Sequence, residues 1–412
     1  MTQQSRIRTL DLIRGIAVLG ILAINIASYA GPDSGLQTPN LPHPGSAADQ
    51  WAFAFKLVFF EGKMRGLFAM LFGASMLLYL DRREATGRDG DWLQLRRLFW
   101  LGLFGLAHFI LFWDGDILFL YACVGVGALL LRNAAPLAMA IVALAAFTLW
   151  HVLGMVSWWP SIMREMAVLT GTASPVELQI HREIMAGIVA EDRADSAANL
   201  AGFGAAVRTR LSEQIEHPLM IVAYNWAEAL GYMLIGMALQ RSGFFAGHWP
   251  AARLRLLGFG ATGLGLAATL AFAVWAHPRG YPVLTMQLAQ SYAMVFPHLL
   301  MVTGYAALLV MAAPHLLATR LGQRLEAAGK CAFTNYLGST VLMTAIFSGW
   351  GLGLFGQFGT AKQVWFVLLG WAVMLIWSQP WLARYQQGPL EWLWRCLTEW
   401  QVKPLRRKPT PP

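Results

Sequence analysis

Long apolar stretches, each near the length that crosses a lipid bilayer, recur along this chain of 412 residues. A helix needs about 20 apolar residues to span the hydrocarbon core. Inside lipid only helices and closed barrels satisfy their own backbone, and these stretches are continuous rather than alternating as barrel strands are. The stretches lie at 12–29, 60–80, 98–113, 117–131, 136–158, 219–239, 256–275, 287–312, 331–350 and 363–383. They predict an all-α polytopic membrane bundle of about ten transmembrane helices.

The charge distribution predicts how this bundle is oriented. Apolar residues make up 57% of the chain and charged residues 13%, against about 45–50% apolar residues in soluble domains. With a cytoplasmic amino terminus, the short outer loops hold only Lys56, Arg279 and Lys362. The other cations outside the long segment 159–217 and the spans then face the cytoplasm, namely Arg6, Arg8, Arg82, Arg83, Arg88, Arg96, Arg97, Arg132, Arg241, Arg253, Arg255, Arg320, Arg324, Lys330 and the basic residues from Arg384 to Lys408. This positive-inside pattern predicts two cytoplasmic termini, and it explains the net charge of +9 without a nucleic-acid partner.

One long polar segment divides the chain into parts. We predict an amino-terminal five-helix group at 1–158, an extracytoplasmic helical segment at 159–217, a carboxy-terminal five-helix group at 218–383 and an interfacial amphipathic tail at 384–412. Within the outer segment, Ser174, Pro175 and Glu177 are typical of a helix start. The tail favours contact with membrane lipids, because aromatic and basic residues follow one another there, namely Trp392, Trp394, Trp400, Arg406, Arg407 and Lys408.

Ionisable and strongly polar residues at membrane depth are the candidate functional residues, because each charge there costs at least about 2.5–3.5 kcal/mol. The inner half holds few, chiefly Asp11 with Arg14, three apart on one helix face, and Asn335 with Tyr336. Most lie toward the outer side, namely Asn25, His43, Glu61, Lys63, Arg65, His108, Asp114, Asp116, Asn225, Glu228 and His298. We predict that the outer set meets around one water-reaching cavity. The His, Asp and Glu residues show no tight ligand spacing, so no metal is expected.

Plainer interpretations exist for several of these residues. Glu61 and Arg65 are spaced to pair on a helix, or else the cations only snorkel outward from the end of a span. His108 alone also fits a packed core histidine, and aspartates such as Asp114 fit helix caps. The string GFGATG, which begins at Gly258, matches a dinucleotide-binding pattern, but it lies inside a predicted span and favours close helix packing instead.

Five stretches of the chain resemble the YeiB-like bacterial inner-membrane proteins. They are LDLIRGIAVLGILAINI at 10–26, KMRGLFAMLFG at 63–73, GDILFLYACVG at 115–125, GKCAFTNYLGST at 329–340 and GPLEWLWR at 388–395. The likeness runs from the first span to the tail, so it covers essentially the whole chain. Two positions depart from the usual pattern, Met64, where the family often has Phe, and Lys330, where it usually has Arg.

The first span is also similar to the start of membrane acyltransferases of the heparan-α-glucosaminide N-acetyltransferase type. The matching residues are Leu10, Asp11, Arg14, Gly15 and Asn25. The resemblance implies an enzyme that takes an acyl group from cytosolic acyl-CoA, such as acetyl-CoA, and delivers it to an acceptor reached from the far side. In that group, an Asn on this helix and a His in the following outer loop belong to the active site. Asn25 matches well, and His43 matches loosely because its distance from Asn25 is longer than the pattern.

These residues suggest a mechanism for acyl transfer. The base is His108 or His43, oriented by Asp114 or Asp116, and the carbonyl oxygen is held by Asn25, with Arg65 or Lys63 as further donors. The acceptor is a sugar, lipid head group or secreted metabolite, and its expected contacts are Glu61, Lys63, Arg65, Asn225, Glu228 and His298. The expected contacts of acyl-CoA are Arg14, Arg96, Arg97, Asn335 and Tyr336.

Two other classes of function remain open from the residues alone. A transporter or exporter of a small amphipathic molecule would use the same cavity as its binding site, with carboxylates as proton carriers. A sensor or partner-binding membrane protein is the third class. The sequence leaves the oligomeric state open, a homo-oligomer included.

Overall fold

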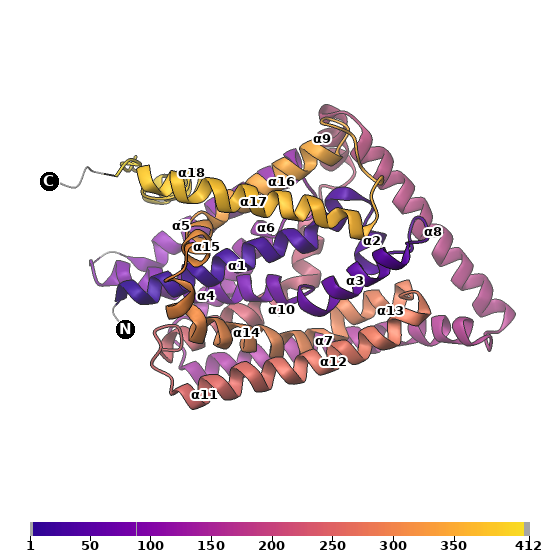
Figure 1. Ribbon diagram of the computed structural model, residues 1–412, viewed down its shortest axis with the longest axis horizontal. Helices are drawn as coiled ribbons and strands as arrows, with labels where there is room; N and C mark the ends of the chain where they lie inside the picture. Colours follow the sequence, from indigo (N-terminus) through magenta and orange to yellow (C-terminus); the bar gives the residue numbers. More distant parts are fainter. Residues whose placement is uncertain (1–2, 88, 408–412) are drawn as a thin grey trace.

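The chain folds into a bundle of helices, seen in a computed structural model that describes residues 3–87 and 89–407 (Figure 1). Across those residues the backbone forms no strand, apart from one isolated bridge between Tyr385 and Arg406. Most helices run roughly along the longest axis of the molecule and pack side by side. The prediction of an all-α bundle is confirmed. Arg88 and Lys408, two of the cations assigned to the cytoplasm, lie outside the described residues.

The helices have the following bounds in chain order: α1 Gln3–Ala30, α2 Ser34–Gln37, α3 Ala47–Phe59, α4 Lys63–Glu84, α5 Gly90–Leu111, α6 Leu118–Leu130, α7 Pro136–Thr170, α8 Pro175–Leu200, α9 Phe203–Ser212, α10 His217–Arg241, α11 Ala251–Arg255, η1 Leu256–Ala261, α12 Thr262–Ala276, η2 His277–Arg279, α13 Val283–Leu288, η3 Ala289–Ala293, α14 Val295–Leu316, α15 Arg320–Lys330, α16 Ala332–Phe347, α17 Thr360–Arg384 and α18 Pro389–Glu399.

Seven helical runs of the described chain are long and apolar enough to cross a membrane, so this is a membrane protein. The runs are Arg8–Ala30, Ala47–Glu84, Pro136–Thr170, His217–Arg241, Ala251–Arg279, Val295–Leu316 and Thr360–Arg384. The shorter apolar helices α6 and α16, together with α5, occupy the remaining three predicted stretches. Every predicted stretch therefore holds a helix, and the number of crossings stays a prediction.

Helix α1 lies at the centre of the bundle. Of the most apolar 18 residues of α1, 78% are buried inside the protein. The corresponding share for α7 is 22%, so α7 lies at the periphery. Glycines allow α1 to approach α15 closely: a Cβ on Gly15 would lie 1.9 Å from the Leu325 carbonyl oxygen, and one on Gly329 would lie 1.8 Å from that of Asp11. Any larger side chain would push the two helices apart. The predicted pair of Asp11 and Arg14 is confirmed, with 2.6 Å between their charged atoms.

The GFGATG string forms part of a helix, not a nucleotide-binding loop. Its first residues lie in η1, a short π-helix that leads into α12. A Cβ on Gly304 of α14 would lie 2.3 Å from Thr262 Oγ1 and 3.2 Å from the Gly258 carbonyl oxygen. Close helix packing is thus the role of these small residues.

The outer segment begins with a continuation of a membrane helix. α7 runs on past Trp158 to Thr170, so the boundary predicted after residue 158 falls inside a helix. The predicted helix start is confirmed: Ser174 and Glu177 form a capping box at the beginning of α8, with Pro175 in its first turn. Its carboxyl end is fixed by a hydrogen bond from the Gly349 amide to the Asn199 carbonyl oxygen, 2.9 Å long.

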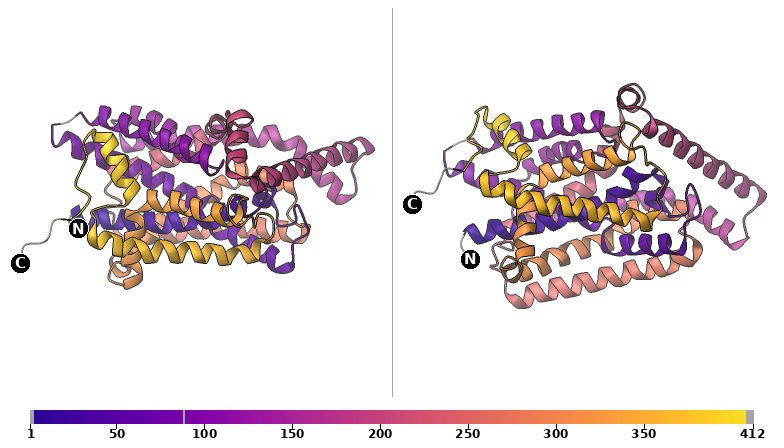
Figure 2. Two further views of the ribbon diagram at one scale, coloured as in Figure 1. Left: turned by 90° about the horizontal axis from the view of Figure 1, so that it is seen from above. Right: turned by 45° about the horizontal axis from the view of Figure 1, so that its top comes forward.

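The two ends of the bundle differ in what they carry. Both termini lie at one end, and α8 crosses the opposite end (Figures 1 and 2). The tail folds back at the end that holds the termini, where α18 packs on α5 and the Trp394 indole donates to the Arg97 carbonyl oxygen at 2.8 Å. Two cavities, one toward each end, form the candidate site.

Candidate functional site

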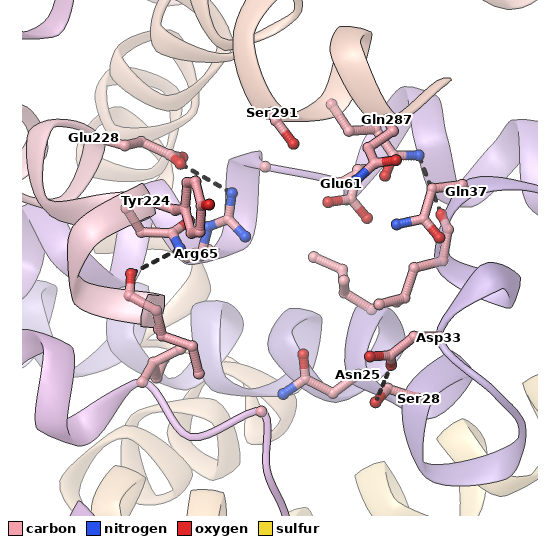
Figure 3. Close-up of a pocket in the computed structure, with 18 of the residues that line it drawn as sticks. Asn25, Ser28, Asp33, Gln37, Glu61, Arg65, Tyr224, Glu228, Gln287 and Ser291 are labelled. Atoms are coloured by element: carbon pink, nitrogen blue, oxygen red, sulfur yellow. Dashed lines mark hydrogen bonds and ion pairs between the residues drawn. The ribbon is translucent and has the colours of Figure 1, made fainter. Parts of the chain in front are cut away.

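A cavity of about 590 Å³ opens among the outer ends of the helices (Figure 3). Its walls come from the end of α1, from α2, from the turn before α4, from the turn between α5 and α6, from the first turns of α10 and from α13 with η3. Segments far apart in the chain therefore converge here. Six residues predicted from the sequence line it, namely Asn25, Glu61, Arg65, Asp114, Asn225 and Glu228.

The turn between α3 and α4 brings two charged residues into the cavity. Gly62 has a positive φ of 72°, which glycine adopts without strain, and the chain reverses there. Arg65 follows on the first turn of α4 and donates to Glu228 on α10 at 2.9 Å. The predicted pairing of Arg65 with Glu61 along one helix is therefore replaced by a pairing between helices, because Glu61 lies in the turn, before α4 begins.

Glu61 is buried in the protein but faces the cavity. The residue is 8% exposed, and its carboxylate points into the open centre in Figure 3. Among the described residues the carboxylate has no hydrogen bond or ion pair. Two lysines attract Glu61 but do not line the cavity. Lys63 donates its Nζ to the Leu57 carbonyl oxygen at 2.8 Å, and Lys56 lies over the Phe53 ring.

Acidic residues crowd the wall of the cavity nearest α8. Asp33 lines the cavity and is exposed there. Its place among the helix ends reduces its solvation, and this, together with repulsion from Asp114 and Asp192, raises the pKa of Asp33 to about 6. Behind it, the pKa of Asp195 is raised to about 8, mainly by burial and then by the same carboxylates. The Ser34 hydroxyl donates to Asp192 at 2.6 Å and joins α2 to α8.

His108 and Asp116 form a buried pair below the cavity. His108 Nδ1 lies 2.8 Å from Asp116 Oδ1, while Asp116 Oδ2 accepts from the Phe119 amide at 3.0 Å, so the carboxylate is held in place. A hydrogen on Nδ1 satisfies this contact and leaves Nε2 as a proton acceptor. Nε2 is buried and has no partner in the described chain. Of the two predicted orienting aspartates, Asp116 contacts the imidazole, and Asp114 lines the cavity instead.

A second, smaller cavity of about 160 Å³ lies toward the end that holds the termini. Three cations line it, Arg14, Arg97 and Lys330, with Tyr336 and Glu391. Arg14 and Lys330 are paired with acidic residues, but Arg97 forms no ion pair within the described residues. Its guanidinium is held between the rings of Tyr79 and Trp394, 4.6 and 4.3 Å from their centroids.

The wall between the two cavities is thin. Ile117 lines the outer cavity and Leu118, the next residue, lines the inner one. The Ile117 amide donates to the hydroxyl of Tyr336, which lines the inner cavity, at 3.4 Å. His108 lies 5.5 Å from the Tyr336 ring and 6.3 Å from the Trp113 ring, between centroids, and Trp113 lines the outer cavity. His108 therefore contacts one residue from each cavity.

Several predicted residues lie away from both cavities. His43 is exposed on the loop before α3. His298 is buried against Gly62, and neither of its ring nitrogens has a partner in the described chain. Asn335 joins α15, α16 and α17 through Ala328, Ser378 and Trp377, and Arg96 stacks on Trp400. No group of three or more His, Cys, Asp or Glu among the described residues can hold a metal ion.

Sequence reasoning found Asn25 and Asn225 but missed other uncharged side chains of the outer cavity. Gln37, Gln287 and Ser291 line it, and their side chains form no hydrogen bond to any described residue. Gln290 lines it too and donates to the Leu36 carbonyl oxygen at 3.1 Å. A signal was present in the sequence. Gln290 and Ser291 follow Gln287 by three and four residues, the spacing of one helix face.

Comparison with known proteins identifies the family. Residues 239–401 match the family described as "Protein of unknown function (DUF418)". The uncharacterized protein YeiB of Escherichia coli (strain K12) is 32% identical to this chain over 404 residues, which are 95% of each protein. The chain belongs to the YeiB-like DUF418 family. The uncharacterized protein YxaH of Bacillus subtilis (strain 168) is 29% identical over an alignment 416 residues long, gaps included, which covers 98% of this chain and 96% of YxaH. No solved structure matches.

The family assignment confirms the resemblance seen in the five sequence stretches. Those stretches supply parts of both cavities: Asn25 and Arg65 line the outer one, Lys330 and Trp394 line the inner one, and Asp116 orients His108. The names of these relatives state no activity, and the geometry of this DUF418 protein is the guide to its chemistry.

Proposed function

We propose that this DUF418 protein is an acyltransferase of the bacterial inner membrane, which moves an acyl group from cytosolic acyl-CoA to an acceptor in the outer cavity. One observation carries the proposal: two cavities toward opposite ends of the bundle meet at a thin wall, and a His–Asp pair is buried beside that wall. A donor and an acceptor that arrive from opposite sides need this arrangement.

The inner cavity suits the reactive end of an acyl thioester. Its volume of about 160 Å³ is below the roughly 300–1,000 Å³ of ordinary ligand sites, so it has room for the end of the pantetheine arm and not for the nucleotide. Arg97 is the cation there without an anionic partner among the described residues, and its guanidinium can donate to the amide carbonyl oxygens of the pantetheine arm. We therefore assign Arg97, with Arg14 and Lys330, to the donor. Phe68 and Phe72 supply an apolar surface for the acyl chain.

The transfer step uses His108 as base and then as acid. His108 Nε2 takes the proton from the acceptor's hydroxyl or amine, which attacks the thioester carbonyl carbon. The tetrahedral intermediate collapses, the carbon–sulfur bond breaks, and the proton passes from Nε2 to the departing thiolate of coenzyme A. The Asn25 carboxamide and the Tyr336 hydroxyl lie on the two sides of the wall, where they can donate to the oxyanion. Asp116 keeps the imidazole in the required tautomer.

The test is acceptor-dependent release of thiol from acetyl-CoA by the purified protein in detergent, with the acylated product followed by mass spectrometry. We expect His108→Gln to lower turnover by at least about 100-fold, the size of a general base contribution, and Asp116→Asn to lower it less. His315→Gln, on an exposed histidine in the last turn of α14, is the matched control. Full activity of His108→Gln would refute the assignment of the base.

The transporter alternative predicts a different result from the same preparation. In proteoliposomes a transporter moves its substrate across the membrane without consuming acetyl-CoA. Net substrate movement with no thiol release would therefore refute the acyltransferase and favour transport.

A further inference from the structure

The outer cavity carries an excess of negative charge. Four carboxylates line it, Asp33, Glu61, Asp114 and Glu228, against one guanidinium, that of Arg65. Arg65 is already paired with Glu228, so the other three carboxylates form no ion pair with a lining cation. Just behind the wall, Asp192 adds negative charge, whereas Asp195 is largely protonated at neutral pH because its pKa is raised to about 8. Arg210 is the cation that faces Asp114 and Asp195. Such a field attracts cations and repels phosphates and carboxylates.

Glu61 gives this field a specific point of contact. It is nine-tenths buried, it points into the cavity, and it has no hydrogen bond or ion pair among the described residues. A buried carboxylate without a partner is costly, so such groups in native proteins are normally paired. Lys56, Lys63 and Arg65 lie near enough to attract Glu61, but none of them forms an ion pair with it. The two lysines do not line the cavity, so a cation inside it would face Glu61 directly.

Neutral groups around the charges indicate what else the ligand carries. Gln37, Gln287 and Ser291 have side chains with no hydrogen bond to the described protein, and they offer donors and acceptors to hydroxyl groups. Four aromatic residues, Trp113, Trp158, Tyr224 and Tyr292, also line the cavity. Aromatic faces stabilise ammonium groups by cation–π contact.

We propose that the acceptor is a small hydroxylated amine, whose ammonium group pairs with Glu61 while its hydroxyl groups bind the free amides of the outer cavity. This inference rests on the proposed function only in treating the ligand as the acceptor of the acyl group. Binding of the ligand itself needs no acyl donor. A hydroxyl of the ligand, not its ammonium group, is then the nucleophile, because a protonated nitrogen has no free electron pair.

Three six-carbon probes that differ in one substituent test the charge preference. They are glucamine, sorbitol and sorbitol 6-phosphate, which are cationic, neutral and anionic. Binding to the full-length protein in detergent is measured by calorimetry at neutral pH, without acyl-CoA. We expect glucamine to bind at least about tenfold more tightly than sorbitol, and the phosphate to bind more weakly than both. Equal binding of all three, tighter binding of the phosphate, or no binding of glucamine overturns the proposal.

Variants test the contact with Glu61. We expect Glu61→Gln to lower glucamine affinity about tenfold, to that of sorbitol, and to leave sorbitol binding unchanged. Glu183→Gln, on an exposed glutamate of α8, is the matched control. If Glu61→Gln does not fold, Asp33→Asn on the opposite wall takes its place, with an expected loss for glucamine alone. Unchanged glucamine affinity in the folded variant contradicts the proposal. Binding of glucamine without acyl transfer would refute the proposed acyltransferase and leave the proposed ligand standing. Acyl transfer to sorbitol without binding of glucamine would support the acyltransferase and refute the proposed ligand.

Discussion

At the scale of single residues, Asp33 makes the outer cavity sensitive to pH. Loss of solvation and the carboxylates of Asp114 and Asp192 raise its pKa to about 6, so it is largely ionised at pH 7 and largely protonated at pH 5. The Ser28 hydroxyl donates to it at 3.0 Å and favours the ionised form. Asp195 and Arg210 complete the charged groups at this wall.

This titration predicts how binding of a cationic ligand changes with pH. Glucamine stays cationic from pH 5 to 7, so any change in its affinity in that range comes from the protein. If binding requires ionised Asp33, linkage predicts a loss of up to about tenfold between pH 7 and pH 5. Calorimetric titrations across this range measure it. In Asp33→Asn the dependence should flatten, and a variant that keeps the full pH dependence would assign it to another group.

The same scale shows what the sequence can reveal about a site. Charged residues such as Glu61, Arg65 and Glu228 could be predicted to lie in the cavity because charge is costly inside a membrane. Gln37 and Gln287 were missed because one lies in a predicted loop and the other at the first position of a predicted apolar stretch. An uncharged amide does not stand out there as Asn25 does inside the first stretch. The partner of Arg65 could not be predicted either, since Glu228 lies 163 residues further along the chain and only tertiary packing brings it near.

At the scale of helices, the central contact is that of α1 with α15. The helices touch through Gly15 and Gly329, and both belong to the stretches that carry the family resemblance. Hydropathy predicted the apolar helices well, because burial in lipid demands long apolar runs. It did not predict α3, whose residues Ala47–Phe59 lie next to α12 and α17, because neighbours far away in sequence complete the burial of its apolar face.

A substitution at this contact tests its importance. In Gly329→Ala the new methyl group would lie 1.8 Å from the Asp11 carbonyl oxygen, so α1 and α15 must separate. Overpacking of this kind costs about 1–3 kcal/mol. We expect a lower thermal unfolding midpoint in detergent and less protein in the membrane. Gly338→Ala, on α16 where nothing lies within 4 Å of the added carbon, is the control and should behave as the wild type. Equal stability of the two variants would contradict the assigned packing.

At the scale of the whole molecule, the two cavities are offset along the bundle. Arg14 of the inner cavity and Asn25 of the outer one are eleven residues apart on α1, about 16 Å along its axis. The sequence predicted this division of charge between the two ends from the cost of burying ions. The thin wall at Ile117 and Leu118 could not be predicted, because it depends on how each helix is rotated about its axis.

The placement of the two cavities toward opposite ends of the bundle predicts how the protein is oriented in the membrane. The basic connections and both termini should face the cytoplasm, and α8 should face the opposite side. We expect a cysteine at Glu183 of α8 to react with a membrane-impermeant maleimide in spheroplasts, and a cysteine at Thr86, between α4 and α5, to react only after lysis. Cys123 is exposed and is replaced by Ala beforehand, whereas Cys331 and Cys396 are buried. Labelling of both positions from the same side would contradict the assignment of the donor cavity to the cytoplasmic side and of the acceptor cavity to the outer side. Acyl transfer across the membrane would then lose its geometric basis.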